Sequence, residues 1–202
     1  MRKLVQAGLL LLLAAGLAWA QTFETKGAWA RGQTFTIGSA VTEFVVAVDP
    51  LAEETVITIA DLRVTTDNKQ LSVTISTDGG STYIGGTGYR SVSILTSTFG
   101  TNETIDRNDG TAKWDLTSTS SFGVKSDSDA SLSVRLTDFG DDGDAIASWS
   151  GFVGLSGGSG LRVNGSGTVA TAGSRITHVK FLTDDATGFT QGNARVLSWL
   201  GY

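Results

Sequence analysis

The sequence predicts an all-β fold, a single antiparallel β-sandwich of the jelly-roll type with about eight to ten strands. Apolar and polar residues alternate with a period of two along many short segments, and turn-forming residues separate these segments. Beyond the first twenty residues, no segment shows the apolar stripe of an amphipathic helix. Together these observations indicate a chain built from short strands.

The clearest alternation lies in two segments, residues 71–76 and 131–136. In the first, apolar Leu71, Val73 and Ile75 alternate with serine and threonine, and the second segment repeats this pattern. Successive side chains of an extended chain point to opposite faces, so each segment offers one face to a core and the other to solvent. Five further segments rich in β-branched and aromatic residues are 33–37, 43–48, 55–64, 176–182 and 194–200.

Short groups of turn-forming residues separate the predicted strands. The part of the chain from 96 to 129 is rich in Ser, Thr and Gly and has the weakest strand pattern. We expect long loops there, with edge strands near 113–116 and 122–124. The predicted turns are Asp67-Asn68, Asp78-Gly79-Gly80, Asn108-Asp109-Gly110, Gly157-Gly158 and Thr187-Gly188.

Residues 1–20 have the composition of a signal peptide. Arg2 and Lys3 precede an uncharged leucine-rich run, which ends in the small-residue pattern Ala18-Trp19-Ala20. We expect cleavage after Ala20, export to the periplasm or the extracellular space, and a sandwich domain over residues 21–202. The alternative is a retained membrane anchor over residues 4–20, because this stretch approaches the length that a spanning helix needs.

Composition excludes several classes of function. Loss of residues 1–20 would leave 13 basic and 20 acidic residues, a net charge of −7, so nucleic acid is not an expected partner. The chain has no cysteine and therefore no disulfide framework. His178 is the one histidine and lies on the polar face of a predicted strand. The sequence therefore lacks the residues for thiol catalysis and for a histidine-rich zinc site, and it offers no convincing Ser-His-Asp triad.

The densest charge cluster follows the predicted strand at 131–136. It consists of Asp138, Asp141, Asp142 and Asp144, with two glycines between them. Calcium binds six to eight oxygen ligands, and a glycine-bent loop can turn several carboxylates inward, so a calcium site is one hypothesis. The spacing departs from that of an EF-hand loop, and a solvated acidic loop is the alternative that we favour.

Four aromatic residues adjoin predicted loops: Tyr83, Tyr89, Trp114 and Trp149. Exposed tyrosine and tryptophan rings offer a large contact area at a small cost in entropy, so these four are candidate platforms for sugar rings or protein partners. Taken singly, each is better explained as a core or core-edge residue.

A polysaccharide-cleaving enzyme would need two carboxyl groups that face each other across a cleft. Glu43 is the one glutamate that opens a clear strand pattern, and no second glutamate lies on a paired strand pattern. An aspartate pair such as Asp141 and Asp142 would have to take both roles. We therefore expect no enzymatic activity and keep polysaccharide cleavage as the least favoured alternative.

Two stretches resemble one group of proteins. ISTDGGSTYIGGTGYR, from Ile75 to Arg90, resembles the strand, DGG turn and following segment of small β-sandwich proteins in the structural modules of tailed phages. The stretch from Ile176 to Tyr202 resembles their closing hairpin. Its matching positions are Ile176, Val179, Phe181, Gly188, Gly192, Val196 and Gly201.

The resemblance implies a jelly-roll-like virion or tail-associated protein that is non-enzymatic and often oligomeric. The leading hypothesis is therefore a structural or adhesion protein that contacts a host surface or sister subunits in a homo-oligomer or a virion assembly. The alternative is a secreted, host-encoded module that binds a cell-surface glycan, with calcium at Asp138–Asp144 as an optional aid. A membrane enters either hypothesis only if residues 4–20 are retained.

Overall fold

The structure is a computed structural model that describes residues 29–38, 41–97, 103–118, 123–139, 143–154, 160–184 and 188–201. The predicted signal peptide lies outside these residues. Within the described part, no helix is long and apolar enough to cross a membrane. The described chain forms twelve strands: β1 (Trp29–Ile37), β2 (Glu43–Ala47), β3 (Glu54–Val64), β4 (Leu71–Ser76), β5 (Tyr89–Ser97), β6 (Glu103–Thr111), β7 (Trp114–Asp115), β8 (Ala130–Phe139), β9 (Asp144–Gly154), β10 (Gly160–Ala170), β11 (His178–Thr183) and β12 (Phe189–Trp199).

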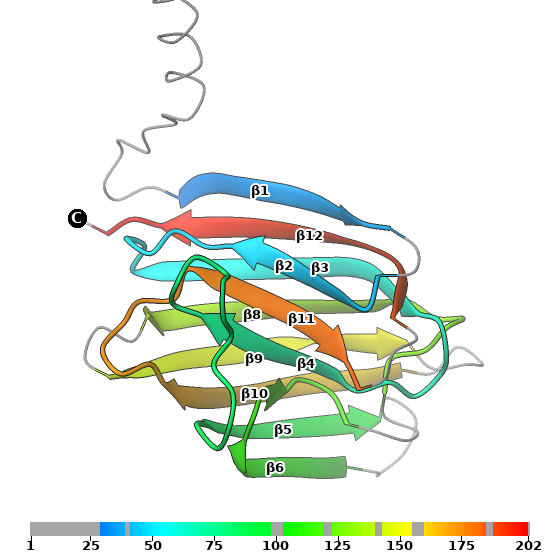
Figure 1. Cartoon of the computed structure of the whole chain (residues 1–202). Coiled ribbons are helices and arrows are strands. Elements are labelled where there is room, and N and C mark those ends of the chain that lie inside the picture. The colour runs from blue at the N-terminus through cyan, green and yellow to red at the C-terminus, as the bar shows by residue number, and fades with distance from the viewer. Residues whose placement is uncertain are drawn as a thin grey trace, which may run out of the picture.

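The strands form two antiparallel sheets of unequal size. The large sheet has eight strands in the order β1-β12-β3-β8-β9-β10-β5-β6, and the small sheet has four in the order β2-β11-β4-β7. Figure 1 shows the small sheet in front of the large one, with β1 and β6 at opposite edges of the large sheet. The predicted all-β sandwich is confirmed, with twelve described strands where eight to ten were expected. Each of the first four connections crosses between the sheets, as in a jelly roll.

One hydrophobic core fills the space between the sheets. Ile57, Ile59 and Val134 enter it from the large sheet, and Val73 and Phe181 enter it from the small sheet. Each such side chain stabilises the fold by about 1.5–3 kcal/mol when it leaves water. The alternation that marked β4 and β8 in the sequence is the pattern that builds this core.

The predicted loops between residues 96 and 129 are partly wrong. Strand β6 occupies Glu103–Thr111 and includes the predicted turn Asn108-Asp109-Gly110, whose Gly110 has a φ of 69° at the end of the strand. The predicted edge strand at 113–116 is found as the short β7. Near 122–124 the described residues form a single bridge, Lys69 to Val124. Strand β6 was not predicted from the sequence. An edge strand with one face in water needs few apolar residues, so it lacks the apolar alternation that marks the other strands.

Candidate functional site

Two of the four candidate aromatic platforms, Tyr89 and Trp114, are fully buried. Their rings meet edge to face with centroids 5.4 Å apart. The Tyr89 hydroxyl accepts a hydrogen bond from the Ile75 amide at 2.9 Å, and the Trp114 indole donates to the Thr168 carbonyl at 2.9 Å. Burial raises the pKa of Tyr89 to about 12. These residues join the two sheets and present no ring face to a ligand, as the core alternative predicted.

Trp149 is also a core residue, with 3% of its surface exposed. Its indole nitrogen donates to the Ser93 hydroxyl at 3.1 Å. Gly165 and Gly167 of β10 leave the space that the two indoles occupy, because a Cβ atom at Gly165 would overlap Trp149 and one at Gly167 would lie 2.6 Å from Trp114. Trp149 is buried in the core, as Tyr89 and Trp114 are, so the hypothesis that it is a binding platform is wrong.

Tyr83 is the candidate aromatic that remains partly exposed. It lies in the loop after β4, and the Lys180 ammonium sits 4.1 Å from its ring centroid. Lys180 also forms an ion pair of 3.1 Å with Glu43. Partial burial, followed by the Glu43 and Asp78 charges, raises the pKa of Tyr83. One face of this ring is thus already taken by a cation on the outer side of the small sheet.

The acidic cluster lies mostly outside the described residues. Asp141 and Asp142 are not described, and of Asp138 only the backbone is. Asp144 opens β9 with an exposed side chain. Within the described residues, no group of three or more His, Cys, Asp or Glu side chains could hold a metal ion. The calcium hypothesis stays a prediction about that loop.

The described residues leave the outer face of the large sheet uncovered. Aligned positions run across it in rows, and every side chain in two neighbouring rows is exposed or half-buried. Serine, threonine and asparagine occupy the first four positions of the second row, whereas isoleucine occupies the two positions at its β6 end. The first row is Val56, Arg135, Ser148, Ser166, Val92 and Arg107, and the second is Thr58, Ser133, Ser150, Asn164, Ile94 and Ile105.

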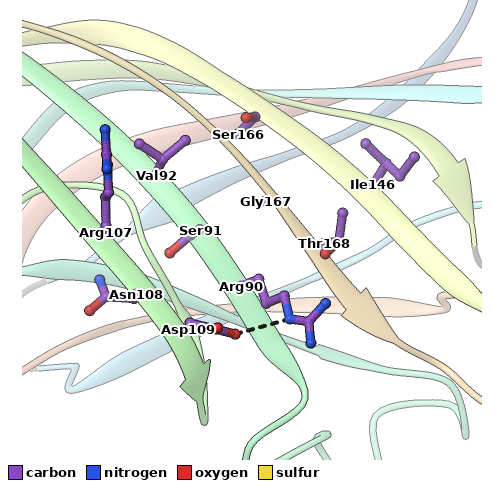
Figure 2. A pocket seen from close by; sticks show the side chains of 10 residues that line it. All are labelled: Arg90, Ser91, Val92, Arg107, Asn108, Asp109, Ile146, Ser166, Gly167 and Thr168. Carbon is purple, nitrogen blue, oxygen red and sulfur yellow. Dashed lines mark hydrogen bonds and ion pairs between the residues drawn. The ribbon is translucent and has the colours of Figure 1, made fainter.

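A shallow groove of about 390 Å³ opens on this face over β5, β6, β9 and β10. Figure 2 shows Arg90 reaching toward Asp109, with which it forms an ion pair of 3.0 Å. Hydroxyl groups can hydrogen-bond sugars or peptides, and arginine can bind carboxylate, sulfate or phosphate with two parallel hydrogen bonds. The groove therefore suits a polar or anionic partner. Its other lining residues are Ser91, Val92, Arg107, Asn108, Ile146, Ser166, Gly167 and Thr168.

Exposed apolar side chains accompany the groove. Ile94, Ile105, Ile146 and Phe152 are 37%, 49%, 42% and 46% exposed, and all four lie on the outer face of the large sheet. The other large apolar residues that are exposed in the described chain, Val41, Val45 and Leu51, lie elsewhere. Apolar side chains gathered on one face, with arginine among them, are typical of an interaction surface.

Strand β5 explains how this patch arises. Ser91 and Ser93 point inward and are buried, while Val92 points outward half-buried and Ile94 points outward exposed. Hydrogen bonds stabilise the inward position of Ser93: its hydroxyl donates to the Asp115 carbonyl at 2.8 Å and accepts from the Trp149 indole nitrogen. The centre of the strand therefore turns Val92 and Ile94 outward, whereas Tyr89 and Leu95 of the same strand point into the core.

A second ion pair lies on the same face near its centre. Arg135 donates two hydrogen bonds of 2.7 Å to the Glu54 carboxylate, one to each oxygen. This carboxylate raises the pKa of the Arg135 guanidinium. The pair borders a second depression, of about 410 Å³, which Ser133, Ser148 and Ser150 also line.

Asp115 is the buried carboxyl group of the β6–β7 end. It accepts hydrogen bonds from the Ser72 hydroxyl at 2.8 Å and from the Asn108 amide at 2.9 Å. Burial raises the pKa of the Asp115 carboxyl, and the hydrogen bond from Ser72 opposes this shift. Each carboxylate oxygen thus binds a donor from a neighbouring strand, so the group ties β4 and β6 to β7.

Sequence reasoning missed most residues of the outer face. Arg90, Arg107 and Ile105 lie in segments that were expected to be loops or were assigned no strand, and Phe152 and Ile146 lie in β9, whose inward positions are partly alanine. The period of two in residues 89–97 could have located the strand β5. The pattern would not have told the two faces apart, because Tyr89 and Leu95 lie on one face and Val92 and Ile94 on the other.

Comparisons with known proteins add no relative to this description. No protein-family model matches the chain. No significant match to a curated protein is found either. The candidate function therefore depends on the fold and on the surface described above.

Proposed function

We propose that the chain is a non-enzymatic structural or adhesion protein, whose sandwich contacts a host surface or sister subunits through the outer face of the large sheet. The observation that carries the proposal is the centre of β5, which turns Ser91 and Ser93 inward and places Ile94 on the surface beside Ile105. On a strand that follows the usual alternation, an apolar residue such as Ile94 would point into the core. Departures of this kind from local rules are typical of functional surfaces.

Three further properties support the proposal. The face combines apolar, arginine and small hydroxyl side chains, the mixture that suits a partly polar protein interface. The composition of residues 1–20 favours export, which would bring the face into contact with the outside of a cell. The resemblance of Ile75–Arg90 and Ile176–Tyr202 to tailed-phage sandwich proteins favours a virion or tail-associated role.

The second candidate is carbohydrate binding, and the groove on the outer face is the observation that favours it. Arg90, Arg107, Ser166 and Thr168 offer charge and hydroxyl groups there, whereas three of the four expected aromatic platforms lie in the core. Recognition would thus rely on hydrogen bonds and charge, which favours an acidic polysaccharide over a neutral one.

Adsorption experiments with matched variants test the proposal. The purified chain is added to intact cells of the organism whose genome carries its gene. In separate samples it is added to a polyuronate and to a neutral glucan. The Ile146→Asp/Phe152→Asp variant should adsorb to cells at least about tenfold more weakly than the native chain. The control, Val45→Asp/Leu51→Asp, changes residues that are 36% and 75% exposed elsewhere and should adsorb as the native chain does.

Binding of the native chain to the polyuronate alone, with loss of binding in Arg107→Ser, would favour the carbohydrate hypothesis. Equal adsorption of native and Ile146→Asp/Phe152→Asp proteins would contradict the proposal that the outer face is the contact surface.

A further inference from the structure

Strand β6 forms a free edge of the large sheet. It pairs with β5 on one side, and within the described chain no strand pairs with its other side. Every residue of β6 is exposed or half-buried. Such an edge offers a row of backbone N–H and C=O groups that another strand can pair with.

Three outward-facing residues at the start of β6 form a symmetric group. Ile105 lies opposite Ile94 of β5, and Glu103 and Arg107 lie two positions before and after it. All three side chains are exposed, and neither Glu103 nor Arg107 has an ion-pair partner among the described residues. An acidic, an apolar and a basic residue thus occupy equally spaced positions on one face.

We infer that β6 pairs in antiparallel fashion with β6 of a second copy of this chain, about a two-fold axis that lies midway between the two copies of Ile105. Ile105 then faces Ile105 of the partner subunit. Glu103 faces Arg107 of the partner subunit, and the reverse pair forms by symmetry. Opposite charges and apolar residues that face each other across antiparallel strands stabilise the pairing.

The next registers toward the end of β6 are less favourable. A two-fold axis perpendicular to the sheet keeps both outer faces on one side, so the axis must lie midway between the two facing copies of one β6 residue. At Asp106 or Arg107 it would place like charges on the axis. At Asn108 it would pair Arg107 with the partner's Asp109, an aspartate that Arg90 already binds at 3.0 Å.

The register centred on Asn108 also meets an irregular part of the strand. The β5–β6 ladder shifts between Tyr89 and Arg90, and Gly110 has a φ of 69°. It would leave Ile105 facing the partner's Thr111. The register centred on Ile105 instead continues the row from Ile94 through both copies of Ile105 to the partner's Ile94, so an apolar stripe crosses the dimer.

This inference rests on the proposed function, since sister subunits are among the partners named there, and it specifies how they meet. Both large sheets would join into one sheet with their outer faces on the same side. Two copies of the groove and of the exposed apolar residues would then face the same way. A surface partner would meet a doubled contact area.

Charge exchange tests the pairing. The full-length chain is prepared as native protein, Glu103→Arg, Arg107→Glu and the double exchange, and mass is measured by sedimentation velocity over a concentration series. Each single change puts two like-charged pairs into the dimer, so each should raise its dissociation constant at least about tenfold. The double exchange should return it to within about threefold of native.

A mixture of the two single variants gives the sharpest result. One subunit then carries two arginines and the other two glutamates at these positions, so the mixture should form heterodimers at concentrations where each variant alone is monomeric. Arg195→Glu, an exposed change on β12 far from β6, is the matched control and should dimerise as native does.

Circular dichroism shows whether each variant is folded. A native chain that stays monomeric, or single variants that dimerise as well as native, would overturn the inference. Adsorption to cells is a separate readout. A monomer that still adsorbs through Ile146 and Phe152 would refute the dimer and leave the proposed function standing.

Discussion

At the scale of residues, the interior depends on glycines that admit large rings. Gly165 and Gly167 lie on the inward face of β10, against Trp149 and Trp114. Both indole nitrogens reach hydrogen-bond acceptors in the large sheet, Ser93 and Thr168, so neither ring can shift without losing a bond. Close packing of this kind leaves no room for an added methyl group.

Gly167→Ala should therefore lower the free energy of unfolding by about 1–3 kcal/mol. Its Cβ atom would lie 2.7 Å from the Arg90 carbonyl oxygen and 2.6 Å from the Trp114 ring, and the backbone contact cannot rotate away. Urea unfolding, followed by tryptophan fluorescence, measures the change. Gly85→Ala is the control, since nothing lies within 4 Å of its added Cβ atom, and equal effects of the two changes would refute this account of the packing.

At the scale of elements, the turn after β4 shows how a short motif fixes its own geometry. Gly79 and Gly80 have φ angles of 78° and 84°, which glycine adopts without steric cost. The Asp78 carboxylate accepts hydrogen bonds from the Thr82 hydroxyl at 2.6 Å, the Thr82 amide at 2.9 Å and the Ser76 hydroxyl at 2.7 Å. The hydrogen bonds from Thr82, then that from Ser76, lower the pKa of Asp78 to about 2.

The stabilisation by Asp78 should therefore depend on pH in one direction. Because its folded pKa lies below the unfolded value of 3.8, the contribution is present above about pH 4 and is lost as the pH falls through about 2. Asp78→Asn should lower Tm at pH 7 by an amount on the order of a few degrees. Thermal melts of both proteins should converge as the pH approaches 2, and a constant difference from pH 7 to pH 2 would count against this role.

How far sequence predicts the elements depends on how each strand is buried. β4 and β8 carry apolar residues toward the core in strict alternation, and both were predicted. β5 buries Ser93 because hydrogen bonds with the Asp115 carbonyl and the Trp149 indole offset the cost of burying its hydroxyl, and no local pattern encodes these distant partners. β6 has solvent at one edge, so its polar sequence resembled a loop.

The candidate site was harder to predict than the fold. An outer-face site is assembled from β5, β6, β9 and β10, and the register between strands decides that Ile94 meets Ile105 and Ile146 lies beside Thr168. Aromatic residues near glycines and loops suggested exposed rings, but the glycines that make room for Trp149 and Trp114 inside the core are Gly165 and Gly167 of β10. Composition identified the residue types, and strand pairing decided where they lie.

At the scale of the whole molecule, the two sheets differ in width. Four strands pack on one face of eight, and the other face of the large sheet is uncovered in the described chain. A monomeric sandwich has no need for isoleucine and phenylalanine on that face, and Ile105 and Phe152 are nearly half exposed. We therefore propose that a partner covers this face where the protein functions.

Hydroxyl-radical footprinting shows whether the outer face of the large sheet is covered in the native location. The protein is labelled once in its native location and once after purification, and side-chain oxidation is compared by mass spectrometry. We predict that Ile146 and Phe152 are protected at least about fivefold in the native location, whereas Leu51, which is 75% exposed away from this face, is oxidised equally in both samples. Equal oxidation of Ile146 and Phe152 in the two samples would contradict the claim.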